Sequence, residues 1–477
     1  MKRLVVALLV AIVLTSFLAL PVPDKAGHPN VILFFMDDMG YGDLSCYGAL
    51  GYQTPHLDKM AAEGTRFTNF LVAQAVCTAS RAALLTGCYP NRIGLYGALG
   101  PNSPIGLNSS EETLAELLKE QGYATGIFGK WHLGSQPQFL PRQHGFDEYY
   151  GVPYSHDMWP LHPAQASANY PPLQLIEGDK PVKAVNTLED VSELTSSLTH
   201  RTVQFIRKHK KEPFFLYVPH PLPHVPLAAS TRFRGKTARG LFGDVIEELD
   251  WSVGQILDEV KKQGLDKNTL VIFTSDNGPW LNYGDHAGST GGFREGKGTT
   301  FDGGHRVPCI IRWPGKVPVG RVSNKLLSTL DILPTVASLC GARQPTQKID
   351  GVSFEALLKG DESAAPREQF YYYYRRNSLE AVRKGDWKLV LPHEGRSYEG
   401  QLPGTNGMPG KAPENHPFPL ALYNLGRDPG ERYDVKDVFP AMVTELQRLA
   451  EEAREDLGDD ITQRPGKNVR ASGIASK

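Results

Sequence analysis

Four short apolar segments each run directly into a cluster of polar and charged residues. The apolar segments are 30–35, 123–128, 211–219 and 269–274, and the clusters that follow them are 36–40, 129–132, 220–224 and 275–278. Continuous apolar runs of this length are typical of strands that are buried on both faces of a parallel sheet. Because open α/β sheets place their ligand crevice past the carboxyl ends of the strands, we expect the four clusters to meet in one site.

Segments of helical character alternate with these strands. Residues 80–85 are expected to begin one helix, 111–121 show an amphipathic helical pattern, and 244–263 are predicted to form a longer helix. Strands that alternate with helices are typical of parallel sheets. The sequence therefore predicts an α/β fold, with a doubly wound, mostly parallel sheet and helices on both of its faces.

The pattern changes after residue 345. Strand-like segments at 370–374, 380–383 and 387–391 predict a small antiparallel sheet, and 439–457 predict a helix that covers it. The tyrosines at 371–374 are interpreted as strand and core residues, with sugar-ring binding as the alternative. A Gly- and Pro-rich stretch at 394–419 is expected to be a surface loop. We expect a large domain over 26–345, a small α+β subdomain over 346–460 and a flexible tail over 461–477.

The N-terminus has the character of an export signal. Lys2 and Arg3 precede an almost wholly apolar run over 4–20, which Pro21 ends. We predict a signal peptide over 1–25; the alternative is an uncleaved membrane anchor, because the run approaches spanning length. The protein is then expected to be exported, to the periplasm or the medium, or to the lysosome in a eukaryote. After cleavage of the signal we expect no stable membrane association.

The net charge and the number of cysteines limit which partners the protein can bind and how its cysteines can pair. The 51 basic and 52 acidic residues give a net charge of −1, which argues against a nucleic-acid-binding protein. Binding of an anion must then depend on a local pocket. Five cysteines is an odd number, so at least one has no partner within the chain, and the other four could pair in three ways.

Two adjacent carboxylates, Asp37 and Asp38, follow the first apolar strand. They would repel each other unless a cation lies between them. Asp276 and Asn277 supply a second pair of oxygen ligands at the end of another strand, and such hard ligands suit Ca²⁺ or Mg²⁺. The residues therefore predict a divalent cation site. The alternative is that Asp38 or Asp276 only caps a turn.

The segment 77–87 reads CTASRAALLTG and carries a cysteine at an expected helix start. The helix dipole favours an anion there, and Arg81, one turn on, would face the same ligand. The alternative is that Cys77 is a buried small hydrophobe or half of a disulfide.

This segment closely resembles the signature of the formylglycine-dependent (type I) sulfatases. Their pattern is Cys, any residue, Pro or Ala, Ser, Arg, and then Leu-Thr-Gly after three more positions; Ala79 stands where many members have Pro. Further segments resemble the same family, most closely its arylsulfatase A and N-acetylgalactosamine-6-sulfatase branch. These segments are 36–48, 129–134, 144–157, 275–278, 296–304 and 428–435.

The resemblance implies an alkaline-phosphatase-like fold, with 26–345 as the catalytic domain, and hydrolysis of sulfate monoesters. The substrates would be aryl sulfates or the sulfated sugars of polysaccharides or glycosaminoglycans. A formylglycine-generating enzyme would convert Cys77 to formylglycine (3-oxoalanine). One divalent ion, normally Ca²⁺, would be bound by Asp37, Asp38, Asp276, Asn277 and the modified residue 77.

The resemblance also implies the groups around the sulfate ester. Arg81 would support the hydrated aldehyde, and the sulfate would be surrounded by Lys130, His132, Ser155, His224 and Lys297. The family's histidine on this strand is followed two residues later by proline. His224 fits that frame because Pro226 follows it, and His220 is the second choice.

The chemistry of a sulfate monoester explains why a hydrated aldehyde suits this reaction. A serine could attack sulfur, but the sulfated serine would hydrolyse slowly, whereas the second hydroxyl of a hydrate can expel sulfate. Lys130, Lys297 and the metal would neutralise the sulfate oxygens. His224 or Lys297 would protonate the leaving group, and His132 would take the proton of the second hydroxyl.

Two other functions remain open on the sequence. One is a phosphonate or phosphate ester hydrolase of the same superfamily, although paired lysines at a single metal favour sulfate. The other is a non-catalytic glycan-binding relative, if Cys77 is not matured. Substrate selectivity is expected to depend on loops at the mouth of the crevice, such as 156–186 and 394–419.

Overall fold

The computed structural model describes residues 28–162 and 169–475, and the predicted signal peptide lies outside these residues. Its centre is a ten-stranded sheet in which β10, β1, β9, β5 and β6 run parallel and the pairs β10–β11, β6–β7 and β7–β8 are antiparallel. In spatial order the strands are β12 (Arg321–Ser323), β2 (Thr65–Phe67), β11 (Cys309–Arg312), β10 (Thr269–Ser275), β1 (Asn30–Met36), β9 (Phe214–Val218), β5 (Ala124–Lys130), β6 (Glu148–Val152), β7 (Leu173–Glu177) and β8 (Lys180–Val185). The predicted mostly parallel sheet is confirmed.

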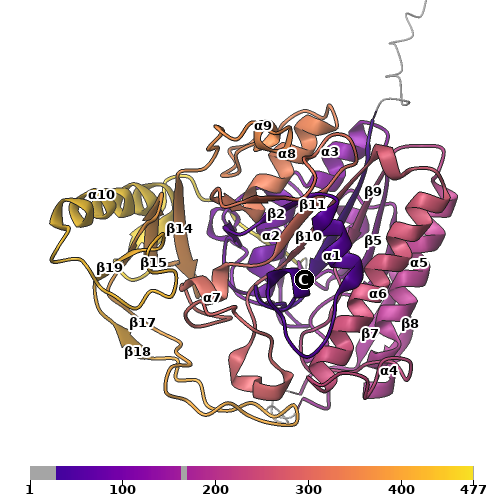
Figure 1. The fold of residues 1–477 in the computed structure, drawn as a ribbon, viewed down its shortest axis with the longest axis horizontal. Coiled ribbons are helices and arrows are strands. Elements are labelled where there is room, and N and C mark those ends of the chain that lie inside the picture. Colours follow the sequence, from indigo (N-terminus) through magenta and orange to yellow (C-terminus); the bar gives the residue numbers. More distant parts are fainter. Residues whose placement is uncertain (1–27, 163–168, 476–477) are drawn as a thin grey trace, which may run out of the picture.

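Helices cover both faces of this sheet (Figure 1). Alternate side chains of β1 point to opposite faces. Val31, Leu33 and Phe35 belong to one core cluster, and Ile32, Phe34 and Met36 belong to another. The first cluster includes side chains of α2 (Cys77–Thr86), α3 (Leu114–Glu120) and α8 (Ile332–Leu339). The second includes side chains of α1 (Pro55–Ala62), α5 (Leu194–Lys208) and α6 (Leu241–Lys262). The doubly wound arrangement expected from the alternating pattern is therefore confirmed.

The register of the parallel strands brings their polar ends together. In β1 and β10, Met36 lies opposite Ser275, so the acidic residues that follow each strand emerge side by side. Two non-glycine residues at this edge, Asp38 and His132, have positive φ angles of 64° and 63°. Such strained backbone persists only where surrounding contacts hold it, and it is concentrated at functional sites.

The C-terminal part forms the smaller antiparallel sheet that the sequence predicts. Its strands are β14 (Gln369–Tyr374), β15 (Ser378–Lys384), β16 (Trp387–Val390) and β19 (Ala421–Asn424), and α10 (Pro440–Leu457) packs against β15 and β16. In Figure 1 this unit lies beside the large sheet, with α10 in yellow. The expected loop at 394–419 differs in one respect, because its ends pair as β17 (His393–Gly395) and β18 (His416–Phe418). Three-residue strands are too short to show a period in the sequence.

Shorter elements complete the described chain. The strands β3 (Phe70–Leu71) and β13 (Leu327–Ser328) form a short pair, and the short helices are α4 (Leu188–Ser192), α7 (Asp302–His305) and α9 (Glu355–Leu358). Of these, α7 follows the segment that carries Lys297.

The segment expected to be a flexible tail, 461–477, is instead attached to the rest of the protein as far as it is described. β21 (Arg464–Pro465) pairs with β20 (Gly458–Asp459), and β22 (Gly473–Ile474) pairs with β4 (Ile105–Gly106) of the large domain. Arg470 also forms an ion pair with Glu111 at 2.7 Å. These contacts join residues far apart in the chain, so a local search for periodicity could not reveal them.

All five cysteines lie in the described part of the chain, and none of them forms a disulfide there. Cys77, Cys88, Cys309 and Cys340 are buried. The alternative in which Cys77 is half of a disulfide is therefore not the arrangement in this structure.

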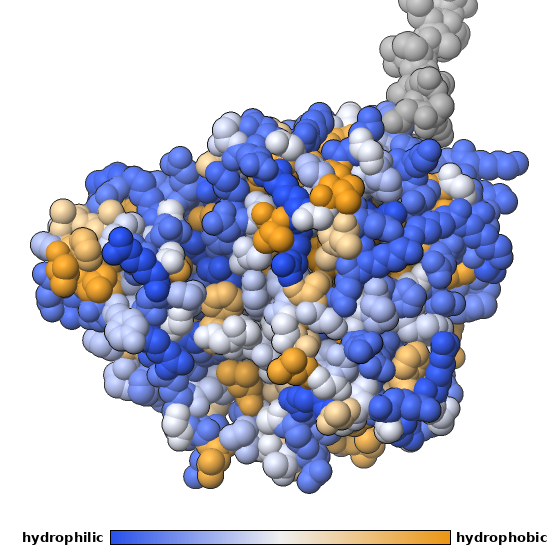
Figure 2. All heavy atoms as spheres, in the orientation of Figure 1, coloured by the Kyte–Doolittle hydropathy of each residue, from blue (hydrophilic) through white to orange (hydrophobic). Residues whose placement is uncertain are grey.

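The face drawn in Figure 2 is mainly hydrophilic, and apolar side chains appear on it singly or in small groups. This distribution is ordinary for a folded domain, because scattered exposed apolar residues need no partner. Among residues 28–162 and 169–475, no helix combines the length and the apolar character needed to cross a bilayer.

A buried acid–histidine pair lies where the C-terminal sheet meets the large domain. Glu380 Oε2 lies 3.3 Å from His393 Nε2 and accepts a hydrogen bond from the Thr300 hydroxyl at 3.0 Å. Burial raises the pKa of Glu380 from 4.5 to about 8, and burial lowers the pKa of His393 to about 4. His393 Nδ1 donates to the Leu391 carbonyl, so its Nε2 is an acceptor and a protonated Glu380 supplies the proton between them.

Replacing this acid predicts a change in the pH dependence of stability. The folded pKa of Glu380 lies above its ordinary value, so its contribution is fully present below about pH 4.5 and is lost as pH rises toward 8. We expect Glu380→Gln, which cannot ionise, to gain in Tm relative to the unsubstituted protein as pH increases from about 5 to about 8. Thermal unfolding of both proteins across this range measures the difference, and a pH-independent difference would contradict the assignment.

Candidate active site

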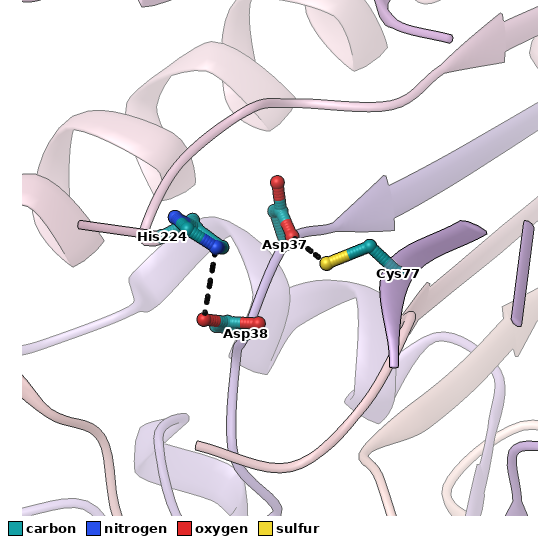
Figure 3. Close-up of side chains that lie close together, drawn as sticks. All are labelled: Asp37, Asp38, Cys77 and His224. Atoms are coloured by element: carbon teal, nitrogen blue, oxygen red, sulfur yellow. Dashed lines mark hydrogen bonds and ion pairs between the residues drawn. The ribbon is translucent and has the colours of Figure 1, made fainter. Parts of the chain in front are cut away.

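Four buried side chains with metal-binding atoms lie together at the carboxyl edge of the sheet (Figure 3). Asp37 and Asp38 follow β1, Cys77 begins α2, and His224 lies after β9; one ligand atom from each lies within 4.8 Å of the others. Cys77 Sγ is 3.5 Å from Asp37 Oδ1, and His224 Nε2 is 3.6 Å from Asp38 Oδ2. The first and third predicted clusters, 36–40 and 220–224, therefore meet, together with the start of α2.

Asp276 and Asn277, after β10, complete the set of oxygen donors. Asp276 Oδ1 accepts the backbone N–H of Asp38 at 3.0 Å, and Asn277 Nδ2 donates to Asp38 Oδ1 at 2.7 Å. Asp38 Oδ2 and Asn277 Oδ1 are buried without a hydrogen-bond partner. Buried oxygens of this kind need a partner, and several hard oxygens in one place are the ligands that Ca²⁺ and Mg²⁺ prefer. The residues present thus fit a divalent cation.

Three cationic side chains face the three carboxylates. Lys130 Nζ lies 2.5 Å from Asp37 Oδ2, and Lys297 Nζ lies 2.6 Å from Asp38 Oδ1. Arg81 donates to Asp276 Oδ2 at 2.7 Å. All six groups are buried or nearly so, and burial makes an unpaired charge costly. The arrangement concentrates both positive charge and hard oxygen ligands around Cys77.

The pKa values of the three carboxyl groups are shifted in different directions. Burial opposes ionisation of Asp37, but the charges of Lys130 and Arg81 outweigh it and hold its pKa well below 3.8. Burial raises the pKa of Asp38, and burial together with the charge of Asp37 raises the pKa of Asp276 to about 7. Burial, reinforced by the like charge of Asp37, raises the pKa values of Asp38 and Asp276, whereas nearby cations reverse the effect of burial at Asp37.

Cys77 is the first residue of α2, a helix rich in Ala and Leu that Gly87 ends with a positive φ of 69°. Its sulfur lies 3.5 Å from Lys297 Nζ. Burial raises the pKa of the thiol, and the nearby lysines do not reverse this effect. An unmodified Cys77 is therefore a protonated, weakly nucleophilic thiol, in contrast to the reactive thiolate that a helix start alone would favour.

The two site histidines are both neutral. Burial, followed by the charge of Lys297, lowers the pKa of His224 to about 3, and burial lowers that of His132 well below 6.5. His224 Nδ1 donates to the Val225 carbonyl at 2.6 Å, and His132 Nε2 donates to the Leu99 carbonyl at 2.9 Å. Each ring therefore keeps one unprotonated nitrogen, which in His132 is the buried and unpartnered Nδ1.

The structure distinguishes the two candidate histidines after β9. His224 lies in the cluster, whereas the ring of His220 contacts the Ser252 hydroxyl at 3.1 Å. Ser155 also lies at the site: its Oγ accepts from Lys130 Nζ at 3.1 Å and is 3.4 Å from His224 Nε2. Every predicted site residue is thus brought into one group.

A cavity of about 180 Å³ opens onto Cys77. Its lining also includes Asp157, Met158 and Arg396, from the loops 156–186 and 394–419 that the sequence places at the crevice mouth, and Tyr374, from the tyrosine run with sugar binding as its alternative. Val76, Ala98 and Trp280 line it as well and were not singled out from the sequence. The Trp280 ring lies 4.6 Å from Lys297 Nζ, and its position two residues after the 275–278 cluster was the available signal. Tyr374 and Arg396 come from the C-terminal subdomain, and no local pattern singles out these two residues within their segments.

Comparison with known proteins agrees with this geometry. The model of the sulfatase family matches residues 29–342, and the model of the C-terminal region of aryl-sulfatases matches 365–472. The chain belongs to the sulfatase family. It is therefore a sulfuric ester hydrolase, as the resemblance of its motifs predicts.

Individual sulfatases are similar over most of their length. Arylsulfatase A of Bos taurus is 42% identical over 432 residues, which cover 86% of this chain and 84% of the relative. N-acetylgalactosamine-6-sulfatase of Mus musculus is 38% identical over 465 residues, covering 92% and 88%. The crystal structure of the PsFucS1 sulfatase from Pseudoalteromonas sp. superposes with a TM-score of 0.80 at 29% identity and 90% coverage of each chain. Both the predicted family branch and the fold are confirmed.

Proposed function

We propose that this sulfatase cleaves sulfate monoesters with a formylglycine made from Cys77 and with one bound Ca²⁺. The observation that carries the proposal is the position of Cys77. Its free sulfur lies 3.5 Å from both Asp37 Oδ1 and Lys297 Nζ, and Cys77 lines the cavity. A nucleophile at this position would have metal-binding carboxylates on one side and a cation for the sulfate oxygens on the other.

The residues that would hold the cation are Asp37, Asp38, Asp276, Asn277 and the modified residue 77. When bound, the cation supplies positive charge that favours a nucleophilic hydroxyl and stabilises sulfate oxygens. The hydrate of formylglycine supplies two hydroxyl groups on one carbon. Arg81 orients Asp276 through its 2.7 Å ion pair and adds a fixed positive charge beneath the site.

The chain's own cations bind and orient the sulfate. Lys130 and Lys297 approach residue 77 from different elements, so their ammonium groups can contact different sulfate oxygens. Such preorganised donors stabilise charge where it develops in the transition state. Ser155 fixes Lys130 through its hydroxyl, and the Trp280 ring packs on Lys297.

Proton transfer is divided between Lys297 and His132. Lys297 is charged, because Asp38 raises its pKa well above 10.5 against the effect of burial, and it can donate to the leaving-group oxygen. His224 is neutral and offers an unprotonated Nε2, so it suits hydrogen bonding to the substrate better than donation of a proton. His132 keeps a free Nδ1, which can accept the proton of the second hydroxyl.

Sulfated sugars are the substrate class that we propose, with aryl sulfates as model substrates. The relatives named N-acetylgalactosamine-6-sulfatase and arylsulfatase A support both. We further propose that a formylglycine-generating enzyme matures the chain, and that the signal over 1–25 directs it to the periplasm or the medium.

Substitution of Cys77 tests the nucleophile. We expect Cys77→Ala to lower kcat on an aryl sulfate at least about a thousandfold, because removing a nucleophile abolishes its covalent route. In the active protein, mass spectrometry of the peptide spanning residue 77 should show a loss of about 18 Da, since an aldehyde replaces the thiol. Circular dichroism controls for folding. Full activity with an intact thiol at residue 77 would refute the proposed nucleophile.

Paired assays on an aryl sulfate and the corresponding aryl phosphate test the specificity of the site. Two lysines around a single cation suit the singly charged sulfate monoester, so we expect the higher kcat/KM on the sulfate. Faster turnover of the phosphate would favour the phosphate or phosphonate ester hydrolase instead.

Removal of metal tests the cation site without relying on activity alone. A ligand at a hundred times its Kd stabilises the folded state by about 2.7 kcal/mol, so Ca²⁺ should raise the Tm of protein dialysed against a chelator. Asp38→Asn, which removes one ligand charge, should weaken that shift. A Tm that responds to neither chelator nor Ca²⁺ would speak against a cation at these residues.

A further inference from the structure

The cavity above Cys77 is not formed by the large domain alone. Tyr374, at the end of β14, and Arg396, just after β17, line it together with residues of the large domain. Both come from the smaller C-terminal sheet region. The lining therefore includes a basic side chain outside the group of cations that faces the buried carboxylates.

Arg396 lies immediately over the residue that follows Lys297. A Cβ atom added at Gly298, whose φ is 81°, would lie 2.7 Å from Arg396 Nη1 and 2.8 Å from the Tyr374 hydroxyl. The positive φ favours glycine here, and any larger residue would have to displace the ends of both side chains. The guanidinium therefore lies beside the part of the cavity that would hold a leaving group in contact with Lys297.

The guanidinium is held in one orientation. Its Nε and Nη2 lie 2.7 and 2.6 Å from Glu414 Oε1, while Nη1 has a longer contact of 3.4 Å to the Tyr398 hydroxyl. The Arg396 side chain is 17% exposed and that of Glu414 is 53% exposed. Glu414 therefore pairs with the Nε and Nη2 edge of the guanidinium, and Nη1 remains as the donor on the cavity side.

The backbone that carries Arg396 is fastened to the segment of Lys297. Ser397 Oγ and Tyr398 N–H donate to the two oxygens of buried Glu295 at 2.6 and 2.7 Å. The Tyr398 hydroxyl donates to the Lys297 carbonyl at 2.6 Å. A charged group held by several such bonds is preorganised, and binding a ligand then costs little ordering of the side chain.

The charges that line the cavity make an anion the fitting ligand of Arg396. Lys297 is paired with Asp38 and lies next to residue 77. The carboxylate of Asp157, which also lines the cavity, would repel an anion bound close to it. Arg396 is the remaining cation among the lining residues, and a guanidinium pairs with carboxylate or sulfate more strongly than with a neutral oxygen.

We propose that Arg396 selects sulfate esters whose leaving group carries a second anionic substituent, a carboxylate or another sulfate. This inference rests on the sulfate-ester cleavage proposed above. Acidic and multiply sulfated sugars have this chemistry, and simple aryl sulfates lack it. Tyr374 contributes a hydroxyl beside Nη1 and limits the position that the second anion can take.

The test compares two isosteric substrates that differ in charge. Phenyl sulfate bearing a ring carboxylate and phenyl sulfate bearing the corresponding carboxamide are assayed with the matured protein and with Arg396→Gln. We expect the carboxylate-to-carboxamide ratio of kcat/KM to fall about tenfold in the variant, mainly through KM, because one charge-assisted hydrogen bond is lost. Arg396→Lys, which keeps the charge, should retain part of the ratio.

Arg427→Gln is the matched control, because Arg427 is an exposed arginine of the same subdomain that does not line the cavity. It should leave the ratio unchanged. Equal loss on both substrates in Arg396→Gln, with an unaltered Tm, would overturn the proposal, as would an unchanged ratio. If the unsubstituted, matured protein cleaves neither sulfate, the proposed function fails instead, so the two failures are distinguishable.

Discussion

The site depends on one electrostatic balance, in which three buried carboxylates meet three buried cations around the first turn of α2. Asp37 faces Lys130, Asp38 faces Lys297, and Asp276 faces Arg81. Removing one partner of a buried pair leaves an uncompensated charge and typically costs about 3–5 kcal/mol. The same balance serves function, because the carboxylates that neutralise the cations are also the hard oxygens that a divalent ion requires. Stability and chemistry are thus coupled in the same six side chains.

The sheet makes this balance achievable. Asp37 and Asp276 lie 239 positions apart in the chain, yet the parallel register of β1 and β10 places them at adjoining strand ends. Strands buried on both faces cannot slip in register without exposing apolar side chains, so the positions of the acidic residues are fixed by packing. The positive φ of Asp38 is then tolerated because Asp276, Asn277 and Lys297 all hold its side chain or backbone.

Much of the fold and most of the site could be predicted from the sequence because their signals are local. The apolar run before Asp37 and the motif from Cys77 are contiguous, and each identifies its own element. The attachment of the C-terminal segment was not predictable, because it depends on pairing of β22 with β4 and on the ion pair of Arg470 with Glu111. The protonation states of the site were equally hidden, since burial decides them and the sequence does not give burial.

Tyr374 illustrates where sequence reasoning reaches its physical limit. The tyrosines of β14 differ in environment: Tyr372 and Tyr373 are fully buried, whereas Tyr374 lines the cavity beside Gly298. A run of identical residues carries no sign of which member faces a ligand; only docking of the small sheet on the large domain assigns it. Tyr398 contributes to that docking, because its N–H donates to Glu295 and its hydroxyl donates to the Lys297 carbonyl. The subdomain therefore helps to line the cavity at Cys77, because the segments that carry Lys297 and Arg396 are joined by these hydrogen bonds.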